Sequence, residues 1–323
     1  MRAIEAEKAG GPEVLRLVDA PLPEPGPGQI RIRHEAIGLN FIEVYQRTGL
    51  YPMTYPARLG QEAAGVVDAV GEGVTRFKLG DRAGFVAGSS GAYAEASVVP
   101  ADRAVHIPAS VSSEAAAACL LKGMTAEFLV RRTFHVKHDD AMLVHAAAGG
   151  VGSILTQWGH ALGARVIGAV GSEEKAKVAK AQGCDDVLVY GRDDIPVRVK
   201  ALTGGNGVRV VYDSVGQATF DDSLASLARR GMLVSFGNAS GPAPAVEPLR
   251  LSRGGSLFLT RPTLFDYITT TEELDESAGA LFEMVGSGKI KIEIGQRFPL
   301  DQVRQAHEAL EGRRTTGSTV IVP

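Results

Sequence analysis

The sequence predicts an α/β protein with a doubly wound parallel sheet in its middle and a β-rich region before it. Three observations carry this prediction. Apolar runs alternate with helical stretches after residue 140, a glycine-rich turn follows the first of these runs, and short β-type runs fill the first 110 residues. A chain of 323 residues is long enough for about two domains.

The first 110 residues are expected to form strands. Runs rich in Ile, Val and Ala are separated by turn signals such as Gly-Gly-Pro at 10–12 and PLPEPGPGQ at 21–29. Serines followed by the acidic Glu114 then predict a helix over 112–122. A second helix is expected over 124–132.

The middle of the chain is expected to form the parallel sheet. Apolar runs of about five residues are typical of strands that are buried on both faces, and the helical stretches between them supply the crossovers. The six expected strands are AMLVH at 141, RVIGAV at 165, DVLVY at 186, VRVVYD at 208, MLVSFG at 232 and SLFLT at 256.

The tail returns to helices, near 272–287 and 301–311, and ends in a strand, STVIV. These changes of pattern place domain boundaries near residues 122 and 261. The expected division is therefore 1–121 with 262–323 as one domain and 122–261 as the other.

Composition excludes several classes of protein. Two cysteines cannot form a four-thiolate zinc lobe or a C-x-x-C redox site. A net charge of −3 without basic clusters does not fit a nucleic-acid-binding protein. The first residues are charged, and no apolar stretch is long enough to span a membrane. A soluble cytoplasmic protein is therefore expected.

The segment AAAGGVG at 146–152 joins the first strand of the expected sheet to a helix. Such a turn presents backbone N–H groups and the positive end of the helix dipole to a pyrophosphate. Gly149 and Gly150 allow close approach of the phosphates, and Gly152 allows the helix to pack on the strand. Ala147 replaces the first glycine of G-x-G-x-x-G, so this motif alone is incomplete.

The residues that follow the second strand of the expected sheet, RVIGAV at 165, indicate which nicotinamide cofactor is bound. An NAD site has a carboxylate there for the ribose, whereas this chain has Gly171-Ser172 followed by Lys175. This arrangement favours NADPH over NADH. Two alternatives stay open: Lys175 is a solvated helix residue, or Glu173 or Glu174 takes the ribose.

Further motifs resemble the zinc-free NADPH:quinone oxidoreductases, including ζ-crystallin, of the medium-chain dehydrogenase/reductase superfamily, and most closely the bacterial type. The resemblance covers essentially the whole chain. The segments that carry it are AIGLNFIEVYQRTGLYP at 36–52, LGQEAAGVV at 59–67, KLGDRAG at 78–84, HAAAGGVG at 145–152, VYDSVG at 211–216, SFGNASG at 235–241 and TRP at 260–262.

This resemblance implies a GroES-like β-barrel catalytic domain, a Rossmann cofactor domain and a cleft between them. Zinc-dependent relatives have Cys and His ligands where this chain has Asn40 and Gln61. A zinc Lewis acid is therefore not expected, and an acceptor that is already electrophilic fits better than an alcohol.

The resemblance also implies the site residues. Asn40 matches a residue near the nicotinamide, and Tyr45 and Tyr51 match tyrosines that line the substrate cleft. The positions that match cofactor contacts are Asn40, Thr125, Gly149, Gly150, Val151, Ser172, Lys175, Tyr190, Ser214, Phe236, Gly237, Asn238, Thr260 and Arg313.

Two departures from the family's pattern are Gly191, which separates Tyr190 from Arg192, and the pair Glu127-Phe128 in place of two aromatic residues. The first puts the role of Arg192 in doubt. The second changes the side chains that are expected to form the wall of the cleft.

Alternative interpretations of several single residues also stay open. Phe41 and Tyr45 are spaced as a helical core pair, and Tyr51 stands in a loop where a phenol is more often functional. His145, which ends the first strand of the sheet, is expected to be a packed structural histidine. Either phenol, or solvent, would supply a proton to the acceptor.

The predicted function is NADPH-dependent reduction of a quinone in the cytoplasm, by hydride or single-electron delivery. The sequence leaves the oligomeric state open, the resemblance implies a homodimer, and the apolar strand SLFLT is a candidate for edge-to-edge pairing with a second chain. The alternatives are an NADPH-dependent 2-alkenal or enone reductase and a non-catalytic NADPH-binding protein. No nucleic acid, membrane or metal is expected as a partner.

Overall fold

The structure is a computed structural model that describes residues 1–87 and 91–323. It forms two compact units. The outer unit comprises residues 1–124 and 268–323, and the central unit comprises residues 125–267. Within the described residues, no helix is both long and apolar enough to cross a membrane.

Strands and helices alternate along the central unit. The strands are β9 (Ala141–His145), β10 (Arg165–Val170), β11 (Asp186–Val189), β12 (Val208–Asp213), β13 (Leu227–Ser235) and β14 (Phe258–Thr260). The helices are α3 (Gly150–Ala161), α4 (Glu173–Ala181), α5 (Ile195–Leu202), α6 (Phe220–Ala225) and α7 (Pro248–Arg253).

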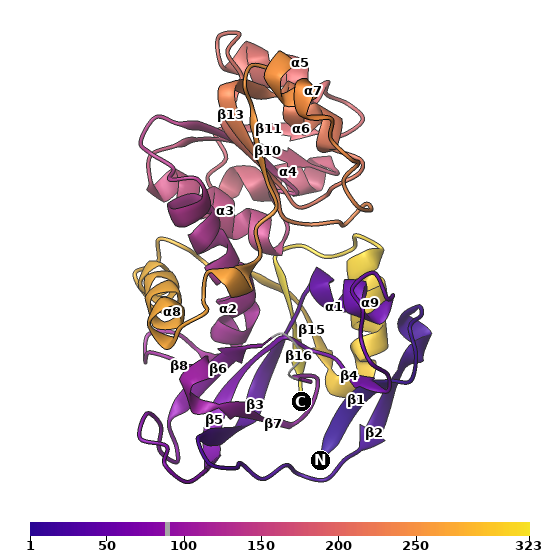
Figure 1. Cartoon of the computed structure of the whole chain (residues 1–323), viewed down its shortest axis with the longest axis vertical. Coiled ribbons are helices and arrows are strands. Elements are labelled where there is room, and N and C mark those ends of the chain that lie inside the picture. Colours follow the sequence, from indigo (N-terminus) through magenta and orange to yellow (C-terminus); the bar gives the residue numbers. More distant parts are fainter. Residues whose placement is uncertain (88–90) are drawn as a thin grey trace. The chain divides into compact units, whose positions relative to one another are not determined.

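These strands form one parallel sheet in the order β11-β10-β9-β12-β13-β14. Helices α3 and α4 pack on β9, β10 and β11, while α5 and α6 contact each other on the opposite face (Figure 1). The strand order reverses between β9 and β12, and ligands bind at such a switch point, outside the carboxyl ends of the strands. The predicted doubly wound sheet is confirmed.

Apolar side chains of the sheet and of helices α5 and α6 build a core of the central unit. Leu143, Ile167, Leu188, Val211 and Leu233 come from five different strands and are all fully or almost fully buried. Burial on both faces explains why these runs are apolar throughout rather than alternating.

The outer unit is mainly antiparallel. Its strands are β1 (Arg2–Ala6), β2 (Leu15–Asp19), β3 (Gln29–Leu39), β4 (Ala57–Arg58), β5 (Glu62–Val70), β6 (Arg82–Val86), β7 (Ala96–Pro100), β8 (Ala104–His106), β15 (Ile294–Pro299) and β16 (Ser318–Val322). Its helices are α1 (Phe41–Arg47), α2 (Ser113–Phe128), α8 (Thr271–Gly286) and α9 (Val303–Glu311), of which α2 continues past Met124.

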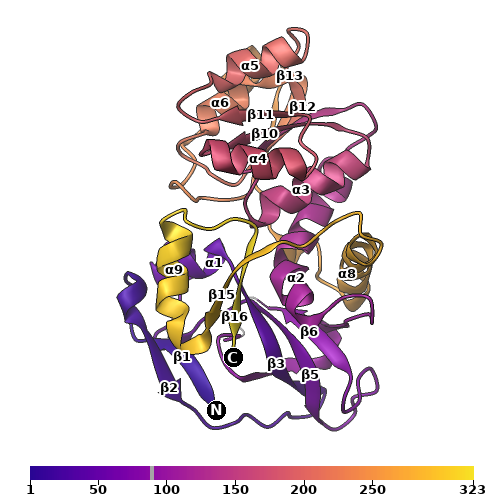
Figure 2. The same cartoon turned by 180° about the vertical axis from the view of Figure 1, so that it is seen from behind.

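The C-terminal tail completes the sheet and the core of the outer unit. The seven-stranded sheet has the order β15-β16-β3-β5-β6-β8, with β7 paired to β3, and a second sheet has the order β2-β1-β4. Figure 2 shows β15, β16 and α9 beside strands from the start of the chain. Leu300, Val303 and Ile321 of the tail pack in one core with Ile4 and Ile30.

Several elements differ from the sequence prediction, and β13 begins at Leu227 rather than at Met232. The two helices expected over 112–132 are one helix, α2, which continues into a π-helical turn at Leu129–Thr133. Gly123 does not break α2. A Cβ on this glycine would lie 2.4 Å from Leu281 Cδ1, so the glycine allows α2 and α8 to pack closely. Strand β15 and the short helix α1 are additional elements.

Candidate cofactor and substrate site

The glycine-rich turn leads from β9 directly into α3. Gly149 is the N-cap of α3, and Gly150 and Val151 begin its first turn. A Cβ on Gly152 would lie only 2.2 Å from the carbonyl oxygen of Ala146, so a larger residue would displace the turn. The first N–H groups of a helix have no intrahelical acceptor, and the dipole is positive there. The turn therefore has the geometry of a phosphate site.

The end of β10 presents a hydroxyl and a lysine. Ser172 is the N-cap of α4, and its Oγ accepts a hydrogen bond of 3.3 Å from the backbone N–H of Lys175. Lys175 therefore lies in the first turn of α4. Tyr190 follows β11, and its backbone N–H donates to the carbonyl oxygen of Val170. Both residues predicted for the 2′-phosphate or adenosine thus follow neighbouring strands of the sheet.

Arg192 is already engaged by carboxylates. Its guanidinium donates to Asp193 Oδ2 at 2.6 Å and also pairs with Glu173. Glu173, one of the alternative partners for a ribose, is thus an ion-pair partner of Arg192. Lys175 is the predicted cation that the first turn of α4 places at this strand end.

The ends of β12 and β13 form a second glycine turn. A Cβ on Gly237 would lie 2.3 Å from the carbonyl oxygen of Ser214, so the segment 236–238 passes close against the end of β12. Arg261 donates to the carbonyl oxygens of Ser235 and Gly237 at 3.0 and 3.2 Å and holds this turn. The hydroxyl of Ser235 is buried with no hydrogen-bond partner in the described part of the chain. A polar ligand fits this cradle.

The remaining predicted cofactor residues lie on separate elements. Thr125 is on α2 and is 9 % exposed, and Thr260 ends β14. Arg313 follows α9, is exposed, and adopts a left-handed conformation with φ +56°. Arg313 and Asn40 belong to the outer unit, whereas Thr125 and Thr260 belong to the central unit.

Asn40 belongs to a buried polar cluster in the outer unit. It is the N-cap of α1, and its backbone N–H donates to Glu43 Oε2 at 2.7 Å. Its side-chain Nδ2 donates to Glu62 Oε1 at 2.9 Å. The same carboxylate accepts from Lys122 Nζ at 3.0 Å and from the backbone of Leu121 at 2.6 Å. Asn40, Glu43, Glu62 and Lys122 are all at most 6 % exposed.

Burial dominates the electrostatics of this cluster. It raises the pKa of Glu43 to about 8, Lys122 opposes the rise, and Glu62 adds to it. Glu43 Oε1 also accepts from the backbone N–H of Gln61 at 3.1 Å. Two carboxyl groups and a single ammonium therefore share one enclosed space, and near neutral pH Glu43 holds a proton.

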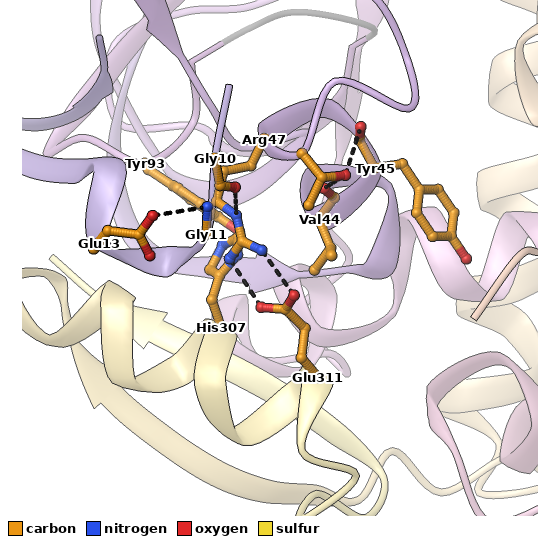
Figure 3. A network of polar contacts seen from close by, with 10 residues as sticks. Gly10, Gly11, Glu13, Val44, Tyr45, Arg47, Tyr93, His307 and Glu311 are labelled. Atoms are coloured by element: carbon orange, nitrogen blue, oxygen red, sulfur yellow. Dashed lines mark hydrogen bonds and ion pairs between the residues drawn. The ribbon is translucent and has the colours of Figure 1, made fainter. Parts of the chain in front are cut away.

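A second buried network holds the other end of α1 (Figure 3). Arg47 is 0 % exposed, and its guanidinium donates to both carboxylate oxygens of Glu311, at 2.7 and 2.9 Å. It also donates to His307 Nδ1 and to the carbonyl oxygen of Gly10. A guanidinium has no acceptor, so Nδ1 must be unprotonated, and Nε2 donates to Tyr93. Burial and the Arg47 charge lower the pKa of His307 to about 3.

The two tyrosines predicted for the substrate lie together. The ring centroids of Tyr45 and Tyr51 are 5.3 Å apart in an edge-on arrangement, and the backbone N–H of Tyr51 donates to the carbonyl oxygen of Tyr45. Tyr45 is 9 % exposed and packs on Phe41, whereas Tyr51 is half-buried. Figure 3 shows the Tyr45 ring directed away from the Arg47 network.

Comparison with known proteins decides the family. Residues 26–109 match the alcohol dehydrogenase GroES-like domain, and residues 150–284 match the zinc-binding dehydrogenase family. A quinone oxidoreductase of Salmonella typhimurium is 50 % identical over 323 residues, which is 99 % of each chain. The chain belongs to the quinone oxidoreductase family.

Solved structures of this medium-chain dehydrogenase/reductase family agree with the assignment. The Escherichia coli quinone oxidoreductase, solved with NADPH, is 47 % identical with a TM-score of 0.98 and full coverage of both chains. A mycobacterial protein solved with NADPH is 50 % identical with a TM-score of 0.97, again over both full chains. The predicted fold class, a GroES-like domain with a Rossmann domain, is confirmed.

The description of the second matching family mentions zinc, and the residues present do not fit that metal. Asn40 and Gln61, at the positions where zinc-dependent relatives have ligands, offer amides instead of thiolate and imidazole. The Gln61 amide donates to Gln46 Oε1 at 3.2 Å, and the Asn40 amide donates to Glu62. Among the described residues, no three His, Cys, Asp or Glu side chains are grouped as a metal would require.

Sequence reasoning did not name the residues that hold the predicted site residues in place. Arg47, Glu62, Lys122 and Arg261 do so through contacts with residues far apart in the chain. Glu43 had a local signal, since Asn-x-x-Glu before an apolar run is a capping pattern.

The close approach at the phosphate turn predicts a selective loss of stability. Gly152→Ala should lower the free energy of unfolding by about 1–3 kcal/mol, because its methyl group meets a backbone carbonyl. Gly171→Ala is the control, since a Cβ there meets nothing within 4 Å. Urea unfolding of both variants checks this, and equal stabilities would contradict it.

The raised pKa of Glu43 predicts a pH-dependent stability. The folded-state pKa of about 8 lies above the ordinary value of 4.5, so the bound proton stabilises the fold at acid pH. This contribution is lost as the pH rises toward 8. Glu43→Gln should therefore gain stability relative to the wild type as the pH increases from about 5 to about 8.5.

Urea unfolding at several pH values measures this difference. Glu35→Gln, at an exposed position of β3, is the matched control and should keep a constant difference from the wild type. A constant difference for Glu43→Gln as well would refute the raised pKa.

Proposed function

We propose that this protein is a zinc-independent NADPH:quinone oxidoreductase. One observation carries the proposal: Asn40 and Gln61 stand at the positions where zinc-dependent relatives have metal ligands, and their amides are held in hydrogen bonds. An acceptor that is already electrophilic, such as a quinone, needs no Lewis acid. The names of full-length relatives at about half identity support the same reaction.

NADPH is the proposed cofactor. The turn with Gly149, Gly150 and Val151 would hold the pyrophosphate, and Lys175 with Ser172 would meet the 2′-phosphate. The glycine cradle at 236–238 and the unpartnered hydroxyl of Ser235 fit the rest of a polar cofactor. The role proposed for Lys175 requires its ammonium near the end of β10, and its place in the first turn of α4 supports this.

The outer unit would supply the substrate side of the site. When bound, NADPH provides a hydride, or electrons singly, to the acceptor. Asn40 would orient the nicotinamide, and Tyr45 and Tyr51 would contact the acceptor. The phenol of Tyr51, which is the more exposed, would donate a hydrogen bond or a proton to the quinone oxygen that gains charge, with solvent as the alternative donor.

We also propose a cytoplasmic homodimer. Strand β14 is an edge of the parallel sheet, and Phe258 on it is 54 % exposed, which suits pairing with the same strand of a second copy. Cys119 and Cys184 are buried free thiols, in keeping with a reducing compartment.

Steady-state assays test the substrate class. With NADPH, 1,4-benzoquinone and 9,10-phenanthrenequinone should give a higher kcat/KM than a 2-alkenal, because a quinone accepts electrons without further activation. A clear preference for the alkenal would replace the proposal with an enone reductase. If NADPH changes the fluorescence of Trp158 on α3 but no acceptor is reduced, the protein is a binding protein instead.

The proposed role of Lys175 predicts a change in cofactor selectivity. Lys175→Ala should weaken NADPH binding by roughly 1–3 kcal/mol, since a charge-assisted contact is lost, and should leave NADH almost unaffected. Trp158 fluorescence titrations measure both affinities. Lys180→Ala is the control, because the Lys180 ammonium bonds the carbonyl oxygen of Asp185 instead. Equal losses for both cofactors would remove Lys175 from the 2′-phosphate.

A further inference from the structure

A fully buried guanidinium lies at the end of the helix that carries Tyr45. Arg47 is the last residue of α1 and is 0 % exposed. Its Nη1 and Nη2 donate to the two carboxylate oxygens of Glu311 at 2.9 and 2.7 Å, Nη1 also donates to His307 Nδ1 at 3.2 Å, and Nε donates to the carbonyl oxygen of Gly10 at 3.1 Å (Figure 3). All three nitrogens of the guanidinium are therefore engaged within the protein, and the burial of Arg47 keeps ligands from it.

A backbone contact fixes the same residue a second time. The N–H of Gly10 donates to the carbonyl oxygen of Arg47 at 3.0 Å, while Arg47 Nε donates to the carbonyl oxygen of Gly10. The last turn of α1 is thus bound both to the start of the chain and to α9 of the tail. A helix of seven residues is too short to be stable by itself, so these contacts determine where its last turn lies.

Both tyrosines that are proposed to contact the acceptor depend on this last turn. Tyr45 belongs to it, and the backbone N–H of Tyr51 donates to the carbonyl oxygen of Tyr45 at 3.0 Å. Thr48, between them, donates its hydroxyl proton to the carbonyl oxygen of Val44 at 2.8 Å. The chain after α1 therefore folds back on the helix, and the Tyr51 ring lies edge-on to the Tyr45 ring. A displacement of the last turn would move both phenols.

The partners of Arg47 on α9 hold it in one orientation. Glu311 supplies the carboxylate of the ion pair. His307 adds no second charge, because burial and Arg47 itself lower the pKa of the imidazole to about 3. The neutral ring accepts from Arg47 at Nδ1 and donates from Nε2 to Tyr93 Oη, which is 3.1 Å away. A carboxylate and a ring of fixed tautomer, both from the tail, therefore set the direction of the guanidinium.

A role of this network in stability alone is the alternative. Removal of one partner of a buried ion pair leaves an unpaired charge and is strongly destabilising, whereas replacement of both partners by apolar side chains is often nearly neutral. Stability and position can therefore be separated. An apolar pair replaces the burial but does not replace the directional hydrogen bonds that orient the last turn of α1.

We propose that Arg47, Glu311 and His307 are positioning residues for the two tyrosines that would contact the acceptor. None of the three touches the acceptor, and each acts through the last turn of α1. The C-terminal tail then sets the geometry of the acceptor side of the site. This inference rests on the proposed function, which assigns Tyr45 and Tyr51 to the acceptor.

Two variants test the proposal. Arg47→Lys keeps the buried charge but loses the paired hydrogen bonds to Glu311. The double variant Arg47→Met/Glu311→Leu removes both charges and should stay close to the wild type in urea unfolding. In both variants kcat/KM for 1,4-benzoquinone should fall about tenfold or more, since a displacement of about 1 Å can cost about a hundredfold in rate.

The affinity for NADPH should stay close to the wild-type value in both variants. The phosphate turn belongs to the central unit, and Asn40 at the start of α1 is held by Glu62 instead. Trp158 fluorescence titrations measure the dissociation constant. A loss of acceptor turnover without a loss of cofactor affinity is the signature of displaced tyrosines.

Asp275→Asn is the matched control. The Asp275 carboxylate pairs with both terminal nitrogens of Arg76, and this ion pair likewise joins the first part of the chain to the tail. It connects α8 to the segment before β6, whereas Arg47 connects α1 to α9. The control should therefore keep both kcat/KM and the NADPH affinity.

A further measurement needs neither NADPH nor a quinone. The ring centroids of Tyr45 and Tyr51 are 5.3 Å apart, so the wild type should show nuclear Overhauser effects between the protons of the two rings. These effects should weaken in both Arg47 variants and persist in Asp275→Asn.

Two results would overturn the proposal. One is a folded Arg47 variant that keeps the wild-type kcat/KM and the contact between the two rings. The other is a loss of kcat/KM that a weaker binding of NADPH explains entirely. If the wild type reduces no quinone, the proposed function fails instead, and the ring contact still decides the inference.

Discussion

The turn between β9 and α3 depends on one steric constraint. Gly152 passes so close to the carbonyl oxygen of Ala146 that only hydrogen fits between them. That approach directs the first turn of α3 toward the carboxyl end of β9 at the switch point of the sheet. Strands β10 and β12 pair in parallel with β9, and β13 pairs in parallel with β12. The residues that follow β10, β12 and β13 therefore lie at the same edge of the sheet as the turn. The place of Gly149, Gly150 and Val151, the residues proposed to contact the pyrophosphate, thus depends on this turn.

The outer unit holds a short helix, α1, that has polar side chains at both ends. Helix α1 has seven residues, which is too few for a helix to be stable by itself. Glu43 and Glu62 hold Asn40 at its start, and Arg47 ties its end to Glu311 and His307 of α9. The C-terminal tail is therefore part of the support for Tyr45 and Asn40.

Both units place ionisable groups where water does not reach, and each balances them differently. Lys122 lies against Glu62, and Glu43 takes up a proton, so the cluster around Asn40 does not hold two bare carboxylates against one ammonium. The Asp213 carboxylate is balanced by hydrogen-bond donors alone. Removal of one partner from either set would leave a buried group unsatisfied, which costs more than the hydrogen bond contributes.

The sequence by itself determined the doubly wound sheet, the position of the phosphate turn and the family, because apolar runs, glycine spacing and local motifs are properties of neighbouring residues. It predicted β9, β10 and β12 to the residue. The sequence prediction divided α2 at Gly123, because a glycine near the expected end of a helix indicates its termination. The packing of Leu281 against this glycine is a tertiary contact that the sequence does not show. The contacts of Asn40 with Glu62, of Arg47 with His307 and of His145 with Tyr190 were decided only by the tertiary structure. Each of them joins residues at least 22 positions apart, and a hydrogen bond over that separation leaves no local pattern.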